Sequence, residues 1–443
     1  MGPEWVAILA LVALFVIGTL LPINMGALAY VAAWLVGMYA LDLDEKEILA
    51  GVSGDLILTL IGVTYLFAIA RNNGTVDLIV RSAVRAVGGR VAFIPWVMFA
   101  VTALLTAIGA VSPAACAIIG PVALGFAGRY RISPLMMGMM VVHGAQAGGF
   151  SPISIYGSIT NSVMKESGLP DSELTIFLAS LVVNTIMAAI LFFLLGGTKL
   201  LSVRIDPTTE DDEVTGVTEE LHRGGTPVPA RGMGTATPVG TRAQGARLDQ
   251  VITLVAFVGV ATIALVFDKN IGFTSITAAV ILAMLSAEEH KDAVKQIAWP
   301  TVLLVAGVST YATVLTTAGS PEFVGKWAAG LGVAAVGALV LCYVGGVVSA
   351  FASSTALLPV IIPIALPLIA EHGISAAMFV AALAVASTIV DVSPFSTNGA
   401  LMLANKPDTI EEQVYYKQIL TYSVIVVLAG PLFVWAALVL PGW

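Results

Sequence analysis

The chain has 443 residues, of which 58% are hydrophobic and only 11% charged, and its mean hydropathy is +0.96. This composition excludes an ordinary water-soluble domain and indicates an all-α polytopic membrane protein. The net charge of −8, with seven acids and no Lys or Arg from Asp206 to Glu220, argues against nucleic acid as a partner.

The first apolar segment covers residues 5–21 and is preceded by Glu4 but by no Lys or Arg. A secretory signal has a positive leading region, so this segment is predicted to be a retained membrane span. A helix crosses a bilayer with about 20 apolar residues. By that measure the first half has four further spans, at 24–41, 56–70, 132–148 with a broken continuation to about 160, and 174–197.

Two uncharged runs are too long for one helix each. Residues 91–128 are interrupted by "GAVSP", and residues 327–370 are interrupted by "SAFASST". We interpret them as helical hairpins at 91–128 and 332–370, whose tips end within the membrane. The alternative is that each run makes two complete crossings, which would leave the flanking residues on the same side.

A polar tract at residues 198–248 divides the chain into membrane parts at 1–197 and 249–443. The tract is rich in Gly, Pro, Thr and charge and poor in large apolar residues, so it is predicted to be a flexible cytoplasmic linker. In the second part, spans are expected at 250–267, 271–286, 298–316, 374–390 with a continuation to 405, and 418–440.

The two parts resemble each other in sequence. Asn24-Met25-Gly26 recurs as Asn270-Ile271-Gly272, and "FSPISIYG" at 150–157 recurs as "VSPFSTNG" at 392–399, sharing Ser-Pro-x-Ser-x-x-Gly. Five spans per part is an odd number, so the second copy is expected to enter the membrane upside down. Such inverted repeats are typical of secondary transporters.

The basic residues predict the orientation. Arg85 and Arg90 precede the first hairpin, and Arg129 and Arg131 follow it, so both hairpin ends are placed in the cytoplasm. With both termini outside, 16 of the 20 Lys and Arg residues lie inside. The four left outside are Lys46, Lys165, Lys269 and Lys326. We therefore expect a multi-pass protein of the cytoplasmic (inner) membrane with a cytoplasmic central loop.

The shared motif breaks two otherwise apolar spans. Irregular backbone at membrane depth is tolerated only where it is buried in protein or lines a wet cavity. A broken helix presents free N–H groups at one stump, which attract anions, and free carbonyls at the other, which coordinate cations. Two breaks and two polar hairpin tips therefore predict one central binding site.

These motifs resemble the ion-transporter superfamily, and most closely its divalent-anion/sodium symporters and the malonate or four-carbon dicarboxylate carriers. In that family the hairpin tips carry Ser-Asn-Thr, where this chain has Ser112-Pro113-Ala114 and Ser353-Ser354-Thr355. The broken helices carry Gly-Gly and Thr-Pro segments ending in Pro-Asn. Here they read Gly148-Gly149-Phe150-Ser151-Pro152, reaching Asn161, and Ser393-Pro394, reaching Asn398.

The resemblance implies roles for individual residues. It places substrate contacts at Ser112, Ala114, Ser154, Ser354, Thr355, Ser396, Thr397 and Asn398. It places cation ligation at Ser112, Gly148, Gly149, Ser151, Ser353, Thr355 and Ser393, and from its own position in the sequence we add Asp391 as a Na⁺ or H⁺ coupling residue. The alternative for any single Ser or Thr is a hydrogen bond to a helix carbonyl.

Asp391 is the most informative single residue, because it adjoins the second break in a stretch without other charges from Gly373 to Asn405. An ionisable group at that depth is costly unless it has a function or a partner. It is a candidate cation ligand or proton carrier, and helix capping is the alternative. His143, alone on an apolar helix, is interpreted as a hydrogen-bonded core residue, with a proton carrier as the alternative.

The functional hypothesis is a secondary carrier of a small dicarboxylate such as malonate or succinate, symported with Na⁺ or H⁺. The resemblance implies an elevator motion and a homodimer. No Lys or Arg occurs within the predicted spans, so helix ends, hydroxyls and co-bound cations would hold the anion. The sequence contains no ATP-binding loop, no metal-ligand cluster and no esterase motif, and Cys116 and Cys342 are isolated in apolar runs. We therefore expect neither an enzyme nor a cofactor. Na⁺ is possible as a coupling ion. The alternatives are a cation/proton antiporter of the same superfamily and a channel or receptor.

Overall fold

The structure is a computed structural model that describes residues 2–85, 90–170, 172–203, 245–267, 269–329, 334–350, 354–372 and 374–441. These residues form helices and their connections, without a β-strand, which confirms the all-α prediction. Six helices of the described part are long and apolar enough to cross a membrane, and shorter apolar helices accompany them. Most of the predicted linker, residues 204–244, and the predicted cation ligand Ser353 lie outside the described residues.

The first half begins with five helices, of which the first, second and fourth match the expected spans to within a few residues. They are α1 (Pro3–Leu20), α2 (Met25–Ala40), α3 (Glu45–Leu49), α4 (Gly54–Asn72) and α5 (Thr75–Arg85). The first long run then forms η1 (Val91–Phe93), α6 (Ile94–Ala107) and α7 (Ser112–Tyr130). The half ends with α8 (Pro134–Gly148), α9 (Ile155–Glu166), α10 (Glu173–Leu194) and η2 (Gly197–Ser202).

The second half has the same order of elements. It starts with α12 (Gly245–Phe267), α13 (Ile271–Leu285), α14 (Ala287–His290), η4 (Ala293–Gln296), α15 (Trp299–Thr317) and α16 (Ser320–Ala329). The second long run forms α17 (Ala334–Ser349) and α18 (Ser354–His372), and α19 (Ala376–Ile389), α20 (Thr397–Ala404) and α21 (Glu412–Leu438) follow. Helices α4 and α15 have 19 residues each, as do α7 and α18.

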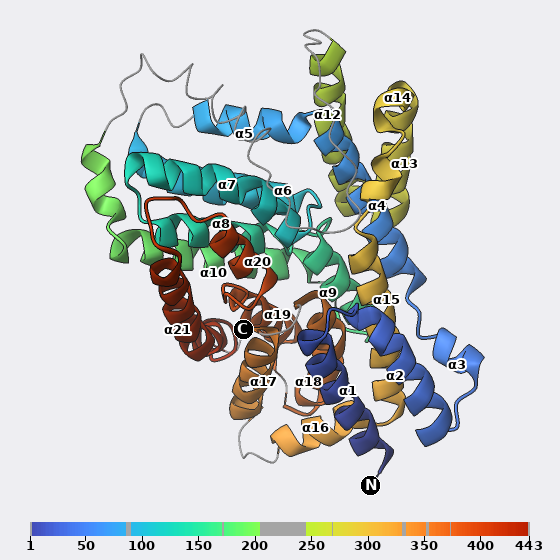
Figure 1. The fold of residues 1–443 in the computed structure, drawn as a ribbon. Helices are drawn as coiled ribbons and strands as arrows, with labels where there is room; N and C mark the ends of the chain where they lie inside the picture. Colours follow the sequence, from blue (N-terminus) through green and yellow to red (C-terminus); the bar gives the residue numbers. More distant parts are fainter. Residues whose placement is uncertain are drawn as a thin grey trace.

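Figure 1 shows two groups of helices side by side. Helices α1, α2, α4, α12, α13 and α15 form one group, and the hairpins, the broken helices, α10 and α21 form the other. The hydrophobic clusters join the two groups: one contains Leu60 of α4 and Val305 of α15 together with Phe379 of α19, and another contains Val360 of α18 together with Tyr311 of α15. Short α3, α5 and α16 were not predicted from the sequence.

Within the first group, α2 crosses α15 and α4 crosses α13 in equivalent ways. A Cβ on Gly26 would lie 2.1 Å from Leu303 O, and a Cβ on Gly272 would lie 2.7 Å from Thr59 N, so both crossings need glycine. At the helix starts, Asn24 Nδ2 donates to Pro300 O at 3.0 Å, and Asn270 Nδ2 donates to Asp55 Oδ1. The repeated Asn-x-Gly sequence therefore marks two equivalent helix crossings, one between α2 and α15 and one between α13 and α4.

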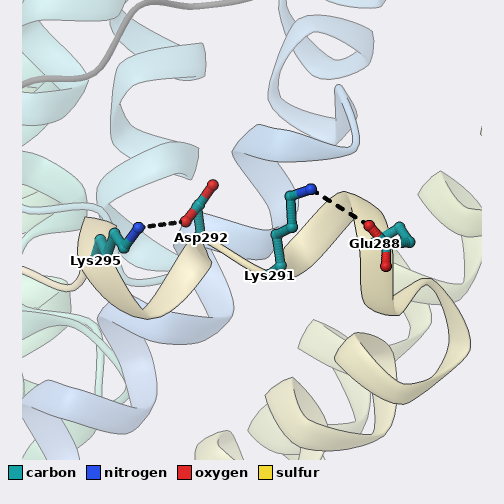
Figure 2. Close-up of polar contacts among 4 residues, drawn as sticks. All are labelled: Glu288, Lys291, Asp292 and Lys295. Atoms are coloured by element: carbon teal, nitrogen blue, oxygen red, sulfur yellow. Dashed lines mark hydrogen bonds and ion pairs between the residues drawn. The ribbon is translucent and has the colours of Figure 1, made fainter.

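The connection between α13 and α15 is strongly polar (Figure 2). Lys291 Nζ lies 3.3 Å from Glu288 Oε2, and Lys295 Nζ lies 2.7 Å from Asp292 Oδ1. The hydrogen bond from Lys295 lowers the pKa of the Asp292 carboxyl. Exposed ion pairs of this kind add little stability, so their main consequence is a solvated end of the helix bundle.

Candidate functional site

The first helix break is built by the Ser-Pro-x-Ser-x-x-Gly motif. Helix α8 ends at Gly148, and α9 starts after Ser154, whose Oγ accepts a hydrogen bond from Gly157 N at 3.3 Å. Ser154 Oγ donates in turn to Ser151 O at 2.6 Å and to Gly149 O. The serine thus caps the new helix and satisfies carbonyls that the broken helix leaves free.

The second break repeats these bonds. Ser396 Oγ accepts from Gly399 N at 3.3 Å and donates to Ser393 O at 2.7 Å. A Cβ at Gly157 or Gly399 would lie 2.0 Å from the carbonyl oxygen of Ser151 or Ser393. The motif therefore determines local structure: its second serine caps the new helix, and its glycine lets the first turn of that helix approach the preceding loop.

The hairpin tips bring further hydroxyls to these breaks. Ser112 is the first residue of α7 and is 4% exposed. In the second hairpin, Ser354 is the first residue of α18, and its Oγ lies 2.7 Å from Ser349 Oγ and donates to Ser387 O at 3.4 Å. Both serines lie at helix N-termini, where unpaired N–H groups favour an anion.

Asn398 joins the first tip to the second break. Its Nδ2 donates to Ser112 Oγ at 2.8 Å and to Asp391 Oδ2 at 2.7 Å. Asn398 is fully buried, and its Oδ1 has no hydrogen-bond partner. Asp391 is 8% exposed and also interacts with the Ser396 side chain and the Asn398 backbone. A carboxylate, an amide oxygen and a hydroxyl are thus gathered in one buried place, and oxygen ligands of this kind suit hard cations.

Tyr156 belongs to this site and was missed in the sequence. Its hydroxyl interacts with the side chains of Ser112 and Ser354, and its ring lies against Phe150 at a centroid distance of 5.4 Å. Tyr156 and Asn398 occupy the same position of the two repeated motifs, three residues after Ser-Pro-x. The repeat itself was therefore the signal that could have found it.

The other predicted site residues are distributed around this centre. Thr355 is 6% exposed in the first turn of α18, whereas Thr397 is exposed and Ala114 is half-buried. Gly148 and Gly149 are buried, and Gly148 packs so closely on α6 that a Cβ would lie 1.8 Å from Ala103 O. Ser151 Oγ donates to Ala107 O at 2.7 Å, which ties the first break to the first hairpin.

His143 lies on α8 outside this centre. It is fully buried, with Nδ1 2.9 Å from Asn184 Oδ1 and Nε2 2.6 Å from the Tyr422 hydroxyl. Both ring nitrogens therefore have a partner in the protein. This matches the interpretation of His143 as a hydrogen-bonded core residue.

Comparisons with known families fit this geometry. Residues 1–149 match the family described as dicarboxylate carrier protein MatC N-terminus, and residues 270–442 match the citrate transporter family CitMHS. No curated protein sequence matches the chain.

Two solved structures show a similar fold. One is the YdaH transporter of Alcanivorax borkumensis, with a TM-score of 0.54, 13% identity, and 98% of each chain covered. The other is MtrF of Neisseria gonorrhoeae, which represents a class of antimetabolite efflux pumps; its TM-score is 0.59 and its identity 11%, with 99% of this chain and 95% of that one covered.

The fold and its apolar helices are those of a multi-pass membrane protein, and the similar structures are transporters. The matched families and structures are transporters rather than enzymes. The N-terminal part of the chain is similar to a dicarboxylate carrier family and the C-terminal part to a citrate transporter family, which confirms the resemblance inferred from the sequence.

Proposed function

We propose that the protein is a secondary carrier that moves a small dicarboxylate, such as malonate or succinate, together with Na⁺ or H⁺. The observation that carries this proposal is the Asn398 bridge between Ser112 and Asp391. It places an acidic side chain beside two helix N-termini, so one compact site contains groups for a cation and groups for an anion.

The anion would bind at the starts of α7 and α18. Ser112, Ser354 and Thr355 supply hydroxyls there, and the first-turn N–H groups supply donors without fixed charge. Tyr156 and Asn398, one from each break, hold these tips in place. The negative charge of Asp391 would repel a dicarboxylate unless a cation or proton neutralises it, which is the physical reason for coupling.

The coupling cation would bind near Asp391. Asn398 Oδ1 is buried without a donor, and Asp391 and Ser112 lie on either side of the same amide. A bound Na⁺ would satisfy this oxygen, while a proton on Asp391 would neutralise the carboxylate directly. Gly148, Gly149, Ser151, Ser353 and Ser393 remain proposed cation ligands by family resemblance.

We also propose the inner membrane as the location, with both termini outside, and an elevator motion within a homodimer. The arrangement of the helices supports this part of the proposal, because the hairpins and broken helices lie beside the group formed by α1, α2, α4, α12, α13 and α15 (Figure 1).

Uptake of labelled malonate and succinate into proteoliposomes tests the proposal. We expect saturable uptake that follows either an inward Na⁺ gradient or an inward H⁺ gradient and that is lost in Asp391→Asn. Asp408→Asn, which removes an exposed carboxylate beyond α20, is the matched control and should retain uptake. Absence of uptake of both acids under every gradient would refute the dicarboxylate assignment.

A second candidate is a cation/proton antiporter, favoured by one observation. Asp391 is a buried carboxylate whose oxygen accepts from an uncharged amide, and no salt bridge pairs it within the described residues. Such a group can exchange a proton for a cation. Cation-dependent proton efflux from the same vesicles, without dicarboxylate, would identify this activity.

A further inference from the structure

A cleft of about 540 Å³ lies between α15 on one side and α9, α16 and α18 on the other. It is separate from the Asp391 centre, because its walls come from the last turn of α9 and from the middle and end of α18. The cleft becomes more buried inward: Thr316 and Ala370 are exposed, whereas Ser309 and Pro359 are buried. Its inner end is one turn from Thr355 and the second hairpin tip.

One wall of the cleft is a ladder of prolines. Pro359, Pro363 and Pro367 are spaced four residues apart within α18, and all three line the cleft. Proline has no N–H, so the carbonyls of Thr355, Pro359 and Pro363 lack the donor that a helix normally provides. Free carbonyls at membrane depth are tolerated where they line a wet cavity. Pro359 and Pro363 themselves line the cleft, so the ladder leaves two carbonyl oxygens without an N–H donor on this wall.

The facing wall adds hydroxyl oxygens from α15. Ser309, Thr313 and Thr316 line the cleft on one face of that helix. Thr313 Oγ1 donates to Ser309 O at 3.3 Å and Thr316 Oγ1 donates to Ala312 O at 2.9 Å, which leaves their lone pairs available. Ser309 is 8% exposed, and its Oγ has no partner. The inner end of the cleft thus holds an unsatisfied buried hydroxyl opposite unpaired carbonyls.

Charge at the mouth favours a cation. Glu166, Glu322 and Lys326 line the outer part, giving two carboxylates and one ammonium group. Ser53 Oγ donates to Glu166 Oε1 at 2.8 Å and holds this carboxylate in place. Oxygen acceptors inside and an excess of negative charge outside attract a cation and oppose a dicarboxylate.

The first half lacks the same arrangement. In α7 the positions equivalent to the three prolines are Ala117, Pro121 and Gly125, so only one proline lies inside that helix. The position equivalent to Thr316 is Arg71, whose guanidinium donates to Gln296 Oε1 at 2.8 Å. The oxygen-lined cleft is therefore a property of one half and not a by-product of the repeat.

We propose that this cleft is the access route and outer binding site of a partly hydrated monovalent cation, with Ser309 Oγ and the carbonyl oxygens of Pro359 and Pro363 as its inner ligands. The inference rests on the proposed cation coupling and deepens it by giving the ion a path separate from the anion. Ions entering here would arrive at Pro359, one turn from Thr355 and the second hairpin tip.

Cysteine labelling tests the route directly. Ser309→Cys is treated with a trimethylammonium and a sulfonate methanethiosulfonate reagent, and each rate is divided by that reagent's rate with a small free thiol. A cation-selective cleft should give about tenfold faster labelling by the cationic reagent. Protection is measured in Thr313→Cys, one turn from Ser309, which keeps the Ser309 hydroxyl; Na⁺ should slow its labelling several-fold relative to choline. The unsubstituted chain is the blank, because Cys116 and Cys342 are buried.

Two matched pairs of variants control for other causes. Ser275→Cys replaces another buried serine without a hydrogen-bond partner, on α13, and should not be labelled. Adding Pro363→Ala to Thr313→Cys restores a donor to the Pro359 carbonyl and should weaken the protection by Na⁺, whereas adding Pro121→Ala in α7 should leave it unchanged. If Ser309→Cys fails to fold, Thr316→Cys at the exposed end carries the same charge-selectivity test.

Equal normalised rates for the two reagents, faster labelling by the sulfonate, or identical rates in Na⁺ and choline would each overturn the proposal. The experiment requires no transport. Failure of dicarboxylate uptake would thus count against the proposed function, while unselective labelling would count against the cation route alone.

Discussion

The Asn398 amide lies between Ser112 Oγ, at 2.8 Å, and Asp391 Oδ2, at 2.7 Å, and so connects the first hairpin to the second helix break. These residues are 286 and 7 positions from Asn398 in the sequence. Because one side chain bonds to both halves, movement of either hairpin tip or break must disturb the other. The site is therefore a shared structure and not two independent half-sites.

Replacement of this amide should impair transport. Asn398→Ala removes the donor to Asp391, and hydrogen bonds to charged groups contribute roughly 1.5–3 kcal/mol, so we expect uptake efficiency to fall by about ten- to a hundredfold. Initial uptake rates over a range of substrate concentrations measure the effect. Asn405→Ala at the other end of α20, where the amide donates to Leu401 O, is the control and should transport normally. Equal losses in both variants would show that the bridge has no special role.

The sequence predicted the helices better than their contacts. Apolar length is a local property, so α1, α2, α4, α8 and α10 were predicted to within a few residues. Amphipathic α5 was missed because its charged residues interrupt the apolar run, although Val76 and Val80 are buried.

Only the part of the site that depends on local sequence was predicted. The Ser-Pro-x-Ser-x-x-Gly motif revealed both breaks because its bonds are local. Tyr156 was missed because it shares a position, and not a chemical type, with Asn398. The pairing of Asn398 with Ser112 depends on how the halves pack, which no local pattern contains.

The helix crossing at Gly307 should tolerate no larger residue. A Cβ there would lie 2.0 Å from Gly26 O, and forcing extra volume into a packed contact costs about 1–3 kcal/mol. Gly307→Ala should therefore lower the thermal unfolding temperature in detergent. Gly259→Ala is the control, because a Cβ at Gly259 meets nothing within 4 Å. That change should be neutral or stabilising by up to about 1 kcal/mol, because alanine favours helix. An equal decrease in both variants would argue against the close crossing.

The His143 network should contribute to stability. Tyr422→Phe would leave a buried ring nitrogen of His143 without its partner, at a cost of about 1–3 kcal/mol. Thermal unfolding in detergent measures this loss. Tyr343→Phe removes a hydroxyl that donates to Leu428 O at an exposed position, and it should cost less. Unchanged stability in Tyr422→Phe would mean that the imidazole finds another partner, which would weaken its assignment as a structural core residue.

His290 should make stability depend on pH. It lies in the polar connection between α13 and α15, and burial lowers its pKa from 6.5, although the nearby Glu289 and Asp249 carboxylates act in the opposite direction. Since the unfolded chain then binds a proton more readily than the folded one, stability should decrease as the pH falls through about 6.5 toward the folded pKa. Unfolding temperatures at pH 7.5 and 5.5 measure this decrease, which should be smaller in His290→Gln, because glutamine cannot bind the proton. If the unfolding temperature of His290→Gln fell as much between pH 7.5 and 5.5 as that of the original chain, other titrating groups would be responsible for the pH dependence.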